Sequence, residues 1–338
     1  MSETKPLQLD VAAQQPWLPE QAGKRLEDCY ILGDVIGRGA SSTVYKCLYK
    51  GKKEYACKVI NKARLVRSAA MKQLPILRTL RHPNIVQVRD VLETESEVQL
   101  VAELMSGGEL LERLAGRGHY SERDAAAAVR QLLSALQYLH GSGVVHGDLK
   151  PEHLLFESED ENSCLKMTDH GLNHLLQKRH PGFPRSYSAP EVLLNKGFGP
   201  PSDIWSLGVI MYIMLCGFEP YWNDSSEAER DSYMFEPPNF TSPLWEEVSD
   251  SAKELITQLL HVDPSSRLSA EEALNHPWVQ GESGGYKHLI STVKRLQEFN
   301  AKRKFRVATC AVLATQRALH LISPERKQKN KIQPKNTF

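Results

Sequence analysis

The chain has 338 residues, of which 41% are hydrophobic and 25% charged, close to the averages of soluble globular proteins. This composition excludes collagen-like and wholly disordered chains, and the length indicates two domains or one unit with two lobes. The formal net charge is only +1, but residues 286–338 carry 13 lysines and arginines against two acidic residues. The C-terminal part is therefore strongly basic, and the part before it is net acidic.

Neither the N-terminus nor the cysteines point to secretion. The first residues contain no apolar stretch of the signal-peptide kind. The longest uncharged apolar run, 204–218, is shorter than the roughly 20 residues that span a bilayer, so we expect a buried core helix there. The six cysteines are scattered without a C-x-x-C pair, which is typical of free thiols. We expect a cytoplasmic or nuclear protein without a membrane span.

The elements in chain order predict a β-rich part followed by an α-rich part. Residues 1–27 contain three prolines among polar residues and are expected to form a flexible tail. Residues 30–58 show three strand patterns separated by turns, which predicts an antiparallel meander. After residue 104 the periodicity becomes helical, as in 122–140 and 249–260.

A glycine turn and a lysine in the β-rich part suggest a phosphate site. Gly37 and Gly39 lie between two strand patterns, where backbone amides without side chains can cover phosphate groups. The same segment could be a glycine hairpin without a ligand, and no helix follows it as in a dinucleotide-binding turn. Lys58 lies between apolar neighbours, and burying its charge is costly unless it meets an anion. The alternative is an exposed strand lysine.

Two acidic residues far along the chain complete a possible phosphoryl-transfer set. Asp148, with Lys150 two residues later, and Asp169 each lie near the end of a short strand pattern. Alone, each acid is more often a turn residue. Together they can divide the roles of base, charge stabiliser and metal ligand. Glu191, Asp203 and Arg267 follow in segments that complete this order of motifs.

With these motifs in this order, residues 30–280 resemble a eukaryotic protein kinase domain. Four further segments resemble the calcium/calmodulin-dependent kinase group, and its type IV members in particular: 106–110, 120–125, 216–220 and 296–301. The resemblance implies an α+β, bilobal protein-kinase fold. It has a small antiparallel β lobe with one helix (28–103) and a larger α-rich lobe (104–280).

The resemblance also implies ATP and Mg²⁺ as cofactors and assigns roles to matching positions. Asp148 would be the base, Lys150 would steady the γ-phosphate, Asp169 would hold Mg²⁺ and Lys58 would hold the α- and β-phosphates. Glu109 and Glu152 would read an arginine upstream of the target Ser/Thr in protein substrates. The remaining nucleotide contacts would come from Gly37, Gly39, Val44, Ala56, Ala102, Glu103, Met105, Glu152 and Leu155, and the small Ala102 predicts an open back pocket.

Five positions depart from the family pattern. Gln73 replaces the glutamate that pairs with Lys58, and Pro75 predicts that the same helix is short or kinked. His153 replaces the asparagine that binds a second Mg²⁺, and is a doubtful ligand because Mg²⁺ prefers oxygen. His170 replaces a phenylalanine of the apolar spine, where a polar ring must find a partner or stay out. Gly147 removes the arginine that clamps a phosphorylated activation loop.

These departures leave two readings of the function open. The first is a Ser/Thr protein kinase of the calcium/calmodulin-dependent type with impaired phosphoryl transfer. It is favoured by the presence of Lys58, Asp148, Lys150 and Asp169. The second is a pseudokinase scaffold that binds calmodulin, and nucleotide, without catalysis. The buried ion pair of Glu191 with Arg267 and the Asp203 cap on the catalytic loop are expected in either case.

The basic segment is predicted to be an amphipathic helix over 294–321. Its charges and anchors are typical of calmodulin targets, although a surface helix packed on the large lobe is the alternative. The resemblance implies an autoinhibitory and calmodulin-binding segment over 281–322 and Ca²⁺/calmodulin as a partner. Residues 323–338 are expected to be a disordered basic tail, with nuclear import or contact with nucleic acid as the less favoured alternative, because no fold for sequence-specific DNA reading is visible. The predicted calmodulin contacts are Lys302, Arg303, Lys304, Phe305, Val312 and Leu319.

Overall fold

The computed structural model describes residues 16–21, 23–39, 41–176, 185–221, 235–241, 243–283, 285 and 288–322. The chain forms two compact units that divide after Gln297. The first unit contains a β-rich part followed by an α-rich part, and the described portion of the second is helical. The α+β fold class and the two-lobed arrangement expected from the sequence are confirmed.

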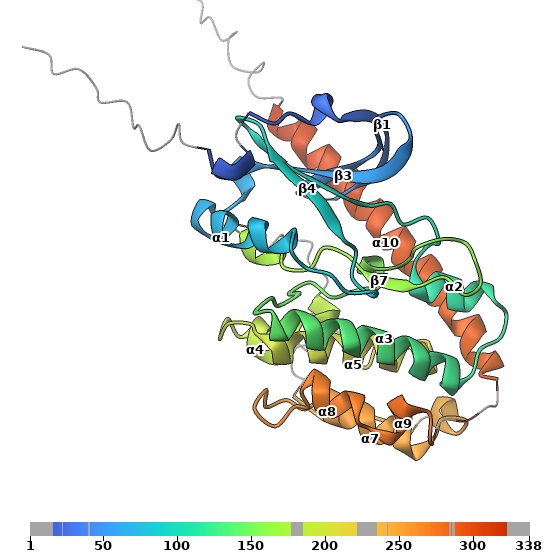
Figure 1. Ribbon diagram of the computed structural model, residues 1–338. Helices are drawn as coiled ribbons and strands as arrows, with labels where there is room; N and C mark the ends of the chain where they lie inside the picture. The colour runs from blue at the N-terminus through green and yellow to red at the C-terminus, as the bar shows by residue number, and fades with distance from the viewer. Residues whose placement is uncertain are drawn as a thin grey trace, which may run out of the picture. The chain divides into compact units, whose positions relative to one another are not determined.

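The small lobe is built on a five-stranded antiparallel sheet in the order β1-β2-β3-β5-β4 (Figure 1). Alternate residues of the central strand β3, including Tyr55 and Cys57, are buried, so one face of the strand packs on the core. The first three strands form the predicted meander. The strands are β1 (Tyr30–Arg38), β2 (Ser42–Tyr49), β3 (Lys53–Asn61), β4 (Val88–Glu93) and β5 (Glu97–Glu103).

One helix, α1 (Arg67–Leu77), follows β3 after the 3-10 turn η4 (Lys62–Arg64). Its buried face consists of Ala70, Leu74 and Leu77. Pro75 lies inside α1 and removes one amide donor from it. The helix ends two residues later, in line with the prediction that this proline shortens it.

The expectation of a flexible tail up to residue 27 is wrong for its last part. Residues 16–28 contain the 3-10 turns η2 (Pro19–Gln21) and η3 (Leu26–Asp28), and Leu18 and Leu26 are buried. The backbone amides of Trp17 and Leu18 donate to the Glu93 carboxylate at 3.1 and 2.8 Å. Two buried leucines and the Glu93 carboxylate thus hold in place a segment that its proline content alone predicted to be flexible. Residues 1–15 lie outside the described residues.

The large lobe is helical apart from a short antiparallel pair, β6 (Leu154–Phe156) and β7 (Leu165–Met167). The long helix α3 begins at a capping box in which the side chains of Ser121 and Asp124 each accept a hydrogen bond from the backbone amide of the other residue. The predicted core helix is α5, which is buried from Ser202 to Cys216 and packs against α3 and α7. The α-helices are α2 (Leu110–Gly116), α3 (Glu122–Gly141), α4 (Pro190–Leu193), α5 (Pro200–Cys216), α7 (Asp250–Leu259), α8 (Ala270–Leu274) and α9 (Pro277–Gln280).

Short 3-10 turns connect these helices and position the loops of the site. The turns are η5 (Pro151–His153), η6 (Asn173–Leu175), η7 (Arg185–Tyr187) and η8 (Pro243–Trp245).

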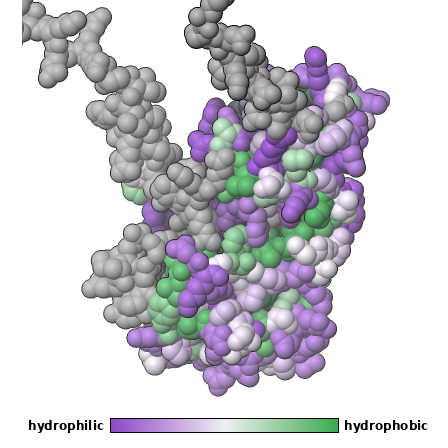
Figure 2. All heavy atoms as spheres, turned by 90° about the vertical axis from the view of Figure 1, so that its left-hand side faces the viewer, coloured by the Kyte–Doolittle hydropathy of each residue, from purple (hydrophilic) through white to green (hydrophobic). Residues whose placement is uncertain are grey.

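Figure 2 shows hydrophilic side chains over much of the described surface on one face, with hydrophobic ones between them. In the part of the chain that the structure describes, no helix has the length and apolarity needed to cross a bilayer.

The last helix, α10 (Ile290–Ile322), confirms that the basic segment is helical. Its first two turns belong to the first unit, where Thr292 and Leu296 are buried and Arg295 Nε donates to the Cys216 carbonyl at 2.7 Å. From Glu298 the helix belongs to the second unit. The side chains of the predicted anchors Val312 and Leu319 lie outside the described residues.

Candidate active site

A cavity of about 530 Å³ lies between the sheet and the α-rich lobe, a volume typical of small-molecule sites. Most of the residues assigned to a nucleotide line it. Gly39 does not line it; its backbone amide donates to the Ser42 carbonyl at 2.9 Å, which closes the glycine turn. The lining includes Gly37, Val44, Ala56, Lys58, Ala102, Glu103, Met105, Glu109, Glu152, His153, Leu155 and Asp169.

Lys58 and Asp169 form an ion pair across this cavity, although they are 111 residues apart. Lys58 is held on β3, where it faces Leu100 of β5 in the sheet register. Asp169 follows β7 with a left-handed φ of 63°, a conformation that aspartate adopts more readily than most residues. Burial raises the pKa of Asp169, but the nearby Lys58 and His153 outweigh this and hold it well below its usual value. Asp169 is therefore an ionised carboxylate at neutral pH.

The loop before β6 brings Asp148 and Lys150 together. Lys150 Nζ donates to Asp148 Oδ2 at 2.8 Å, and both side chains remain partly exposed. His146 is fully buried, which lowers its pKa to about 3 and keeps it neutral. Its Nε2 lies 2.9 Å from the Thr168 carbonyl, so this nitrogen carries the hydrogen, while Nδ1 accepts from the Asp148 amide at 3.3 Å. A neutral histidine thus links the Asp148 loop to the segment before Asp169.

Asp203, at the start of α5, holds the loop that carries Asp148 through hydrogen bonds to its backbone. Its carboxylate accepts from the backbone amides of His146 and Gly147 at 2.8 and 2.9 Å, and lies 2.8 Å from His140 Nε2. Arg267 makes two hydrogen bonds to the Glu191 carboxylate, at 2.8 and 3.0 Å. The structure therefore contains the expected cap and the expected ion pair of the scaffold.

His153 lies between the two acidic residues of the site. Its Nδ1 is 2.7 Å from the Asp148 carbonyl, and its Nε2 is 3.2 Å from Asp169 Oδ2. The side chain is 12% exposed, so the ring is mostly enclosed. The imidazole consequently bridges the backbone of one acid and the side chain of the other.

His170 is buried with a side chain that makes no hydrogen bond to the described residues. It is 3% exposed, and neither ring nitrogen has a partner there. Burial lowers its pKa to about 4 although the Asp169 charge opposes this, so the ring is neutral. The ring is thus inserted into the molecule, and among the described residues its nitrogens find no hydrogen-bond partner.

Two contacts near the cavity were missed by the sequence analysis. The Glu103 carboxylate accepts from Lys166 Nζ at 2.7 Å, which ties the end of β5 to β7. It also accepts from the backbone amide of Gln87 at 3.2 Å. Lys166 is buried between Leu165 and Met167. The argument used for Lys58, that a lysine among apolar neighbours needs an anion, could have found it.

The site described above lies within a segment that matches a known protein family. The family model described as "Protein kinase domain" matches residues 30–279.

The chain belongs to the protein kinase family.

Within that family it is similar to calcium/calmodulin-dependent kinases, as its motifs indicated. It is 42% identical to the human calcium/calmodulin-dependent protein kinase type IV over 315 residues, which cover 89% of this chain and 65% of the relative. It is 39% identical to the type 1 kinase of Macrobrachium nipponense, covering 84% of each chain, and 38% identical to that of Caenorhabditis elegans, covering 86% and 85%. The chain thus spans just under two thirds of the length of the human type IV relative.

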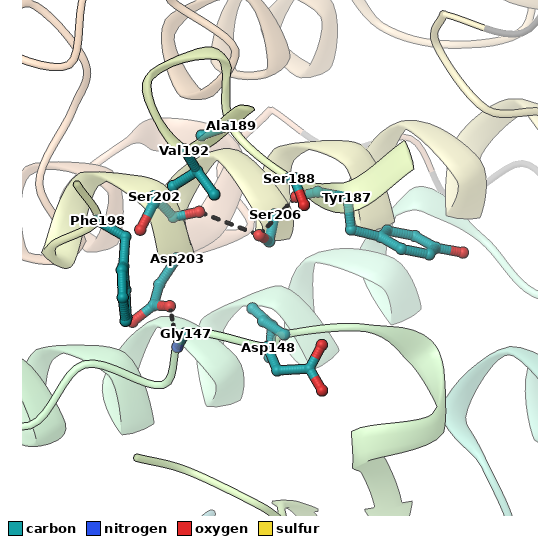
Figure 3. A pocket seen from close by; sticks show the side chains of 11 residues that line it. Gly147, Asp148, Tyr187, Ser188, Ala189, Val192, Phe198, Ser202, Asp203 and Ser206 are labelled. Atoms are coloured by element: carbon teal, nitrogen blue, oxygen red, sulfur yellow. Dashed lines mark hydrogen bonds between the residues drawn. The ribbon is translucent and has the colours of Figure 1, made fainter. Parts of the chain in front are cut away.

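Two aromatic side chains cover the backbone at Gly147, and Figure 3 shows one of them, Phe198, beside it. Gly147 has a φ of 75°, and a Cβ there would lie 2.9 Å from Phe198 Cε2 and 3.4 Å from His174 Nε2. The rings of His174 and Phe198 pack on each other, with centroids 3.8 Å apart and planes tilted by 30°. The cavity beside them holds only about 20 Å³, room for about one water molecule. An aromatic pair therefore covers Gly147.

Gln73, which the sequence analysis compared with the usual partner of Lys58, lies near the turn after Asp169. Gln73 Nε2 lies 2.8 Å from the position that a Cβ on Gly171 would take, so the Gln73 side chain reaches the turn after Asp169. Lys58 Nζ pairs with the Asp169 carboxylate. Residues 177–184 of the activation loop lie outside the described residues, whereas Tyr187 and Ser188 are described and buried.

Proposed function

We propose that the chain is an ATP-dependent Ser/Thr protein kinase of the calcium/calmodulin-dependent type, with slow phosphoryl transfer. The observation that carries this proposal is the ion pair of Lys58 with Asp169 in the lining of the large cavity, together with the Lys150–Asp148 pair on the loop that His146 links to the segment before Asp169. Asp148 receives the proton of the substrate hydroxyl, Lys150 steadies the γ-phosphate and Lys58 contacts the other phosphates. The adenine lies between Val44, Ala56 and Leu155.

The donor atoms fit one Mg²⁺ and do not fit a second. Asp169 supplies ionised oxygens of the kind that Mg²⁺ prefers, whereas His153 presents a nitrogen at the second position. A bound Mg²⁺ would neutralise charge on the phosphates. The absence of an oxygen ligand for a second Mg²⁺ and of a glutamate partner for Lys58 supports slower phosphoryl transfer than in kinases that have both.

The rival function is a pseudokinase, and it is favoured by His170, which lies next to Asp169 and whose ring nitrogens have no partner among the described residues. The deciding experiment measures radiolabelled phosphate transfer to an arginine-containing Ser/Thr peptide at several Mg²⁺ concentrations. We expect weak transfer by the full chain and a further loss, by a factor of about 100 to 10,000, in the Asp148→Asn variant. Equal signals from the two proteins, both folded, would instead support the pseudokinase.

The same assay tests the substrate context. Glu109 and Glu152 line the cavity, which supports recognition of an arginine upstream of the target residue. A peptide in which that arginine is alanine should be phosphorylated less well, through a higher KM. Unchanged KM values would remove the two glutamates from substrate reading.

A calmodulin-binding role for 281–322 is part of this proposal. Lys302, Lys304 and Phe305 are exposed on α10, and Phe305 is 74% exposed. A large apolar side chain flanked by cations matches helix-in-groove recognition by an acidic receptor. The relatives named above carry calmodulin dependence in their names. Localisation in the cytoplasm or nucleus stays a prediction.

A further inference from the structure

Lys166 is a buried cation on β7 with one close anionic partner. It lies between Leu165 and Met167, both fully buried, and is itself only 8% exposed. A buried ammonium is costly unless an anion lies against it. Glu103 supplies that anion, because its Oε2 accepts from Lys166 Nζ at 2.7 Å. The Glu157 carboxylate is 3.7 Å away and half exposed, so Glu103 is the main partner.

This ion pair joins the strands that carry the two walls of the proposed adenine slot. On the small lobe, Ala56 of β3 is paired in the sheet with Ala102 of β5, the residue before Glu103. On the large lobe, Leu155 of β6 is paired with Lys166 of β7. The side chains of Ala56 and Leu155 line the cavity as the opposite walls of the slot. The contact of Glu103 with Lys166 therefore links one wall to the other.

The Glu103 carboxylate is held by a backbone group as well. The Gln87 amide donates to Glu103 Oε2 at 3.2 Å, and the Glu103 amide donates to the Gln87 carbonyl at 3.2 Å. The preceding residue, Val86, donates its amide to the Met167 carbonyl at 2.8 Å. Without Lys166, the carboxylate would keep one neutral donor among the described residues, and its own link to β7 would be lost.

We propose that Lys166 is a positioning residue that sets the spacing of the adenine slot through Glu103. This inference rests on the proposed function, because it concerns the base of the same nucleotide. Lys166 is not among the described residues that line the cavity, so it acts on the slot without touching the ligand. Its effect falls on the base and not on the phosphate groups, which Lys58 and Lys150 contact in the proposed function.

The test compares two ligands of the full chain by calorimetry: adenosine, which has no phosphate, and AMP-PNP with MgCl₂. Lys166→Met keeps the length of the side chain and removes its charge. It should raise the Kd of both ligands by similar factors, about fivefold or more. Lys58→Met should raise the Kd of AMP-PNP by about fivefold or more and leave that of adenosine within about twofold. A loss of stability in Lys166→Met with both Kd values unchanged would show a purely structural role and overturn the inference.

A double-mutant cycle shows whether Lys166 acts through Glu103. Glu103→Gln keeps the shape of the side chain and removes its charge, so it should raise the Kd of adenosine by about threefold or more. This variant decides the question even where Lys166→Met fails to fold. The double variant should bind adenosine within about twofold of Lys166→Met alone, because both substitutions break the same contact. Losses that multiply would overturn the inference.

Glu157→Gln is the matched control, because it removes the charge of the more exposed carboxylate near the same ammonium. It should leave both Kd values within about twofold. A loss equal to that of Glu103→Gln would overturn the assignment to Glu103.

The outcomes separate this inference from the proposed function. Binding of adenosine and AMP-PNP that Lys166→Met leaves unchanged would overturn the role of Lys166 and leave the nucleotide site intact. Binding of neither ligand by the unmodified chain would overturn the proposed function itself.

Discussion

Gly147 combines a left-handed backbone conformation with close neighbours, and the two constraints can be separated. Gly147 and Gly143 have nearly the same φ, 75° and 71°, but a Cβ would meet ring atoms within 4 Å only at Gly147, since nothing lies that close at Gly143. A side chain at either position strains the backbone, and at Gly147 it must also displace Phe198. The packing of His174 on Phe198 thus depends on glycine at this place.

A large side chain at Gly147 should therefore destabilise the protein. We expect Gly147→Arg to lower the free energy of unfolding by about 2 to 4 kcal/mol, and Gly143→Arg by about 1 to 2 kcal/mol because only backbone strain acts there. Urea unfolding followed by circular dichroism measures both. Equal losses in the two variants would show that the contact with Phe198 is unimportant.

His170 is the second residue at which a single substitution should change the free energy of unfolding measurably. Its two ring nitrogens are buried without hydrogen-bond partners among the described residues, which costs free energy in the folded state. His170→Phe, which keeps an aromatic ring and removes both nitrogens, should raise the free energy of unfolding by about 1 to 2 kcal/mol at pH 7. Thermal and urea unfolding test this. A drop in stability would indicate that a partner for the ring exists in solution.

At the scale of elements, buried charges tie the helices of the large lobe together. The Glu122 carboxylate at the start of α3 accepts from the backbone and hydroxyl of Ser249 at 2.9 and 2.6 Å and from Trp278 Nε1 at 2.8 Å. Glu122 is only 3% exposed, so these donors replace water around its charge. One carboxylate thereby joins the N-termini of α3, α7 and α9.

The N-cap of α9 makes part of the stability depend on pH. His276 Nδ1 accepts from the Trp278 amide at 3.2 Å, and burial lowers the His276 pKa although the Glu254 charge opposes this. The folded state therefore prefers the neutral ring, whereas the unfolded chain takes up a proton near pH 6.5. This contribution is complete above that pH and is lost as the pH falls through the folded pKa.

His276→Asn keeps a capping oxygen that does not titrate. Between pH 7.5 and 5 the free energy of unfolding should fall less in this variant than in the unmodified chain. Urea unfolding at both pH values gives the two slopes. Identical slopes would mean that the His276 cap does not contribute to the acid sensitivity.

At the scale of the whole molecule, the sequence predicted the fold and the meeting of Lys58 with Asp169 at one cavity, but not the detailed contacts of the site. Hydrophobic periodicity and the order of the motifs were sufficient to predict the two lobes, the core helix α5 and the basic helix α10. The docking of residues 16–28 was missed because Leu18 and Leu26 are isolated apolar residues without periodicity. The bridging of two acids by His153 depends on a backbone carbonyl and on a loop conformation, neither of which is encoded in a local pattern.

The division into two units makes a further prediction about the basic helix. Phe305 lies in the second unit and is exposed, so its replacement should leave the folding of the first unit unchanged. Phe305→Asp should weaken binding of Ca²⁺-loaded calmodulin to the full chain at least tenfold, because it replaces an apolar anchor by a charge that an acidic receptor repels. Calorimetry measures this, with Ile290→Asp, an exposed position before Gln297, as the control. Equal affinities for the Phe305 variant and the unmodified chain would place the binding elsewhere.

The attachment of Trp17 and Leu18 to Glu93 bears on recombinant work with this kinase. A shortened version starting at Tyr30, the first residue of the family match, would strip Leu18 and Leu26 from the small lobe and uncover the apolar surface beneath them. Such a truncation should precipitate more readily than one beginning ahead of Pro16. The useful boundary for expression thus lies well upstream of the domain that sequence matching delimits.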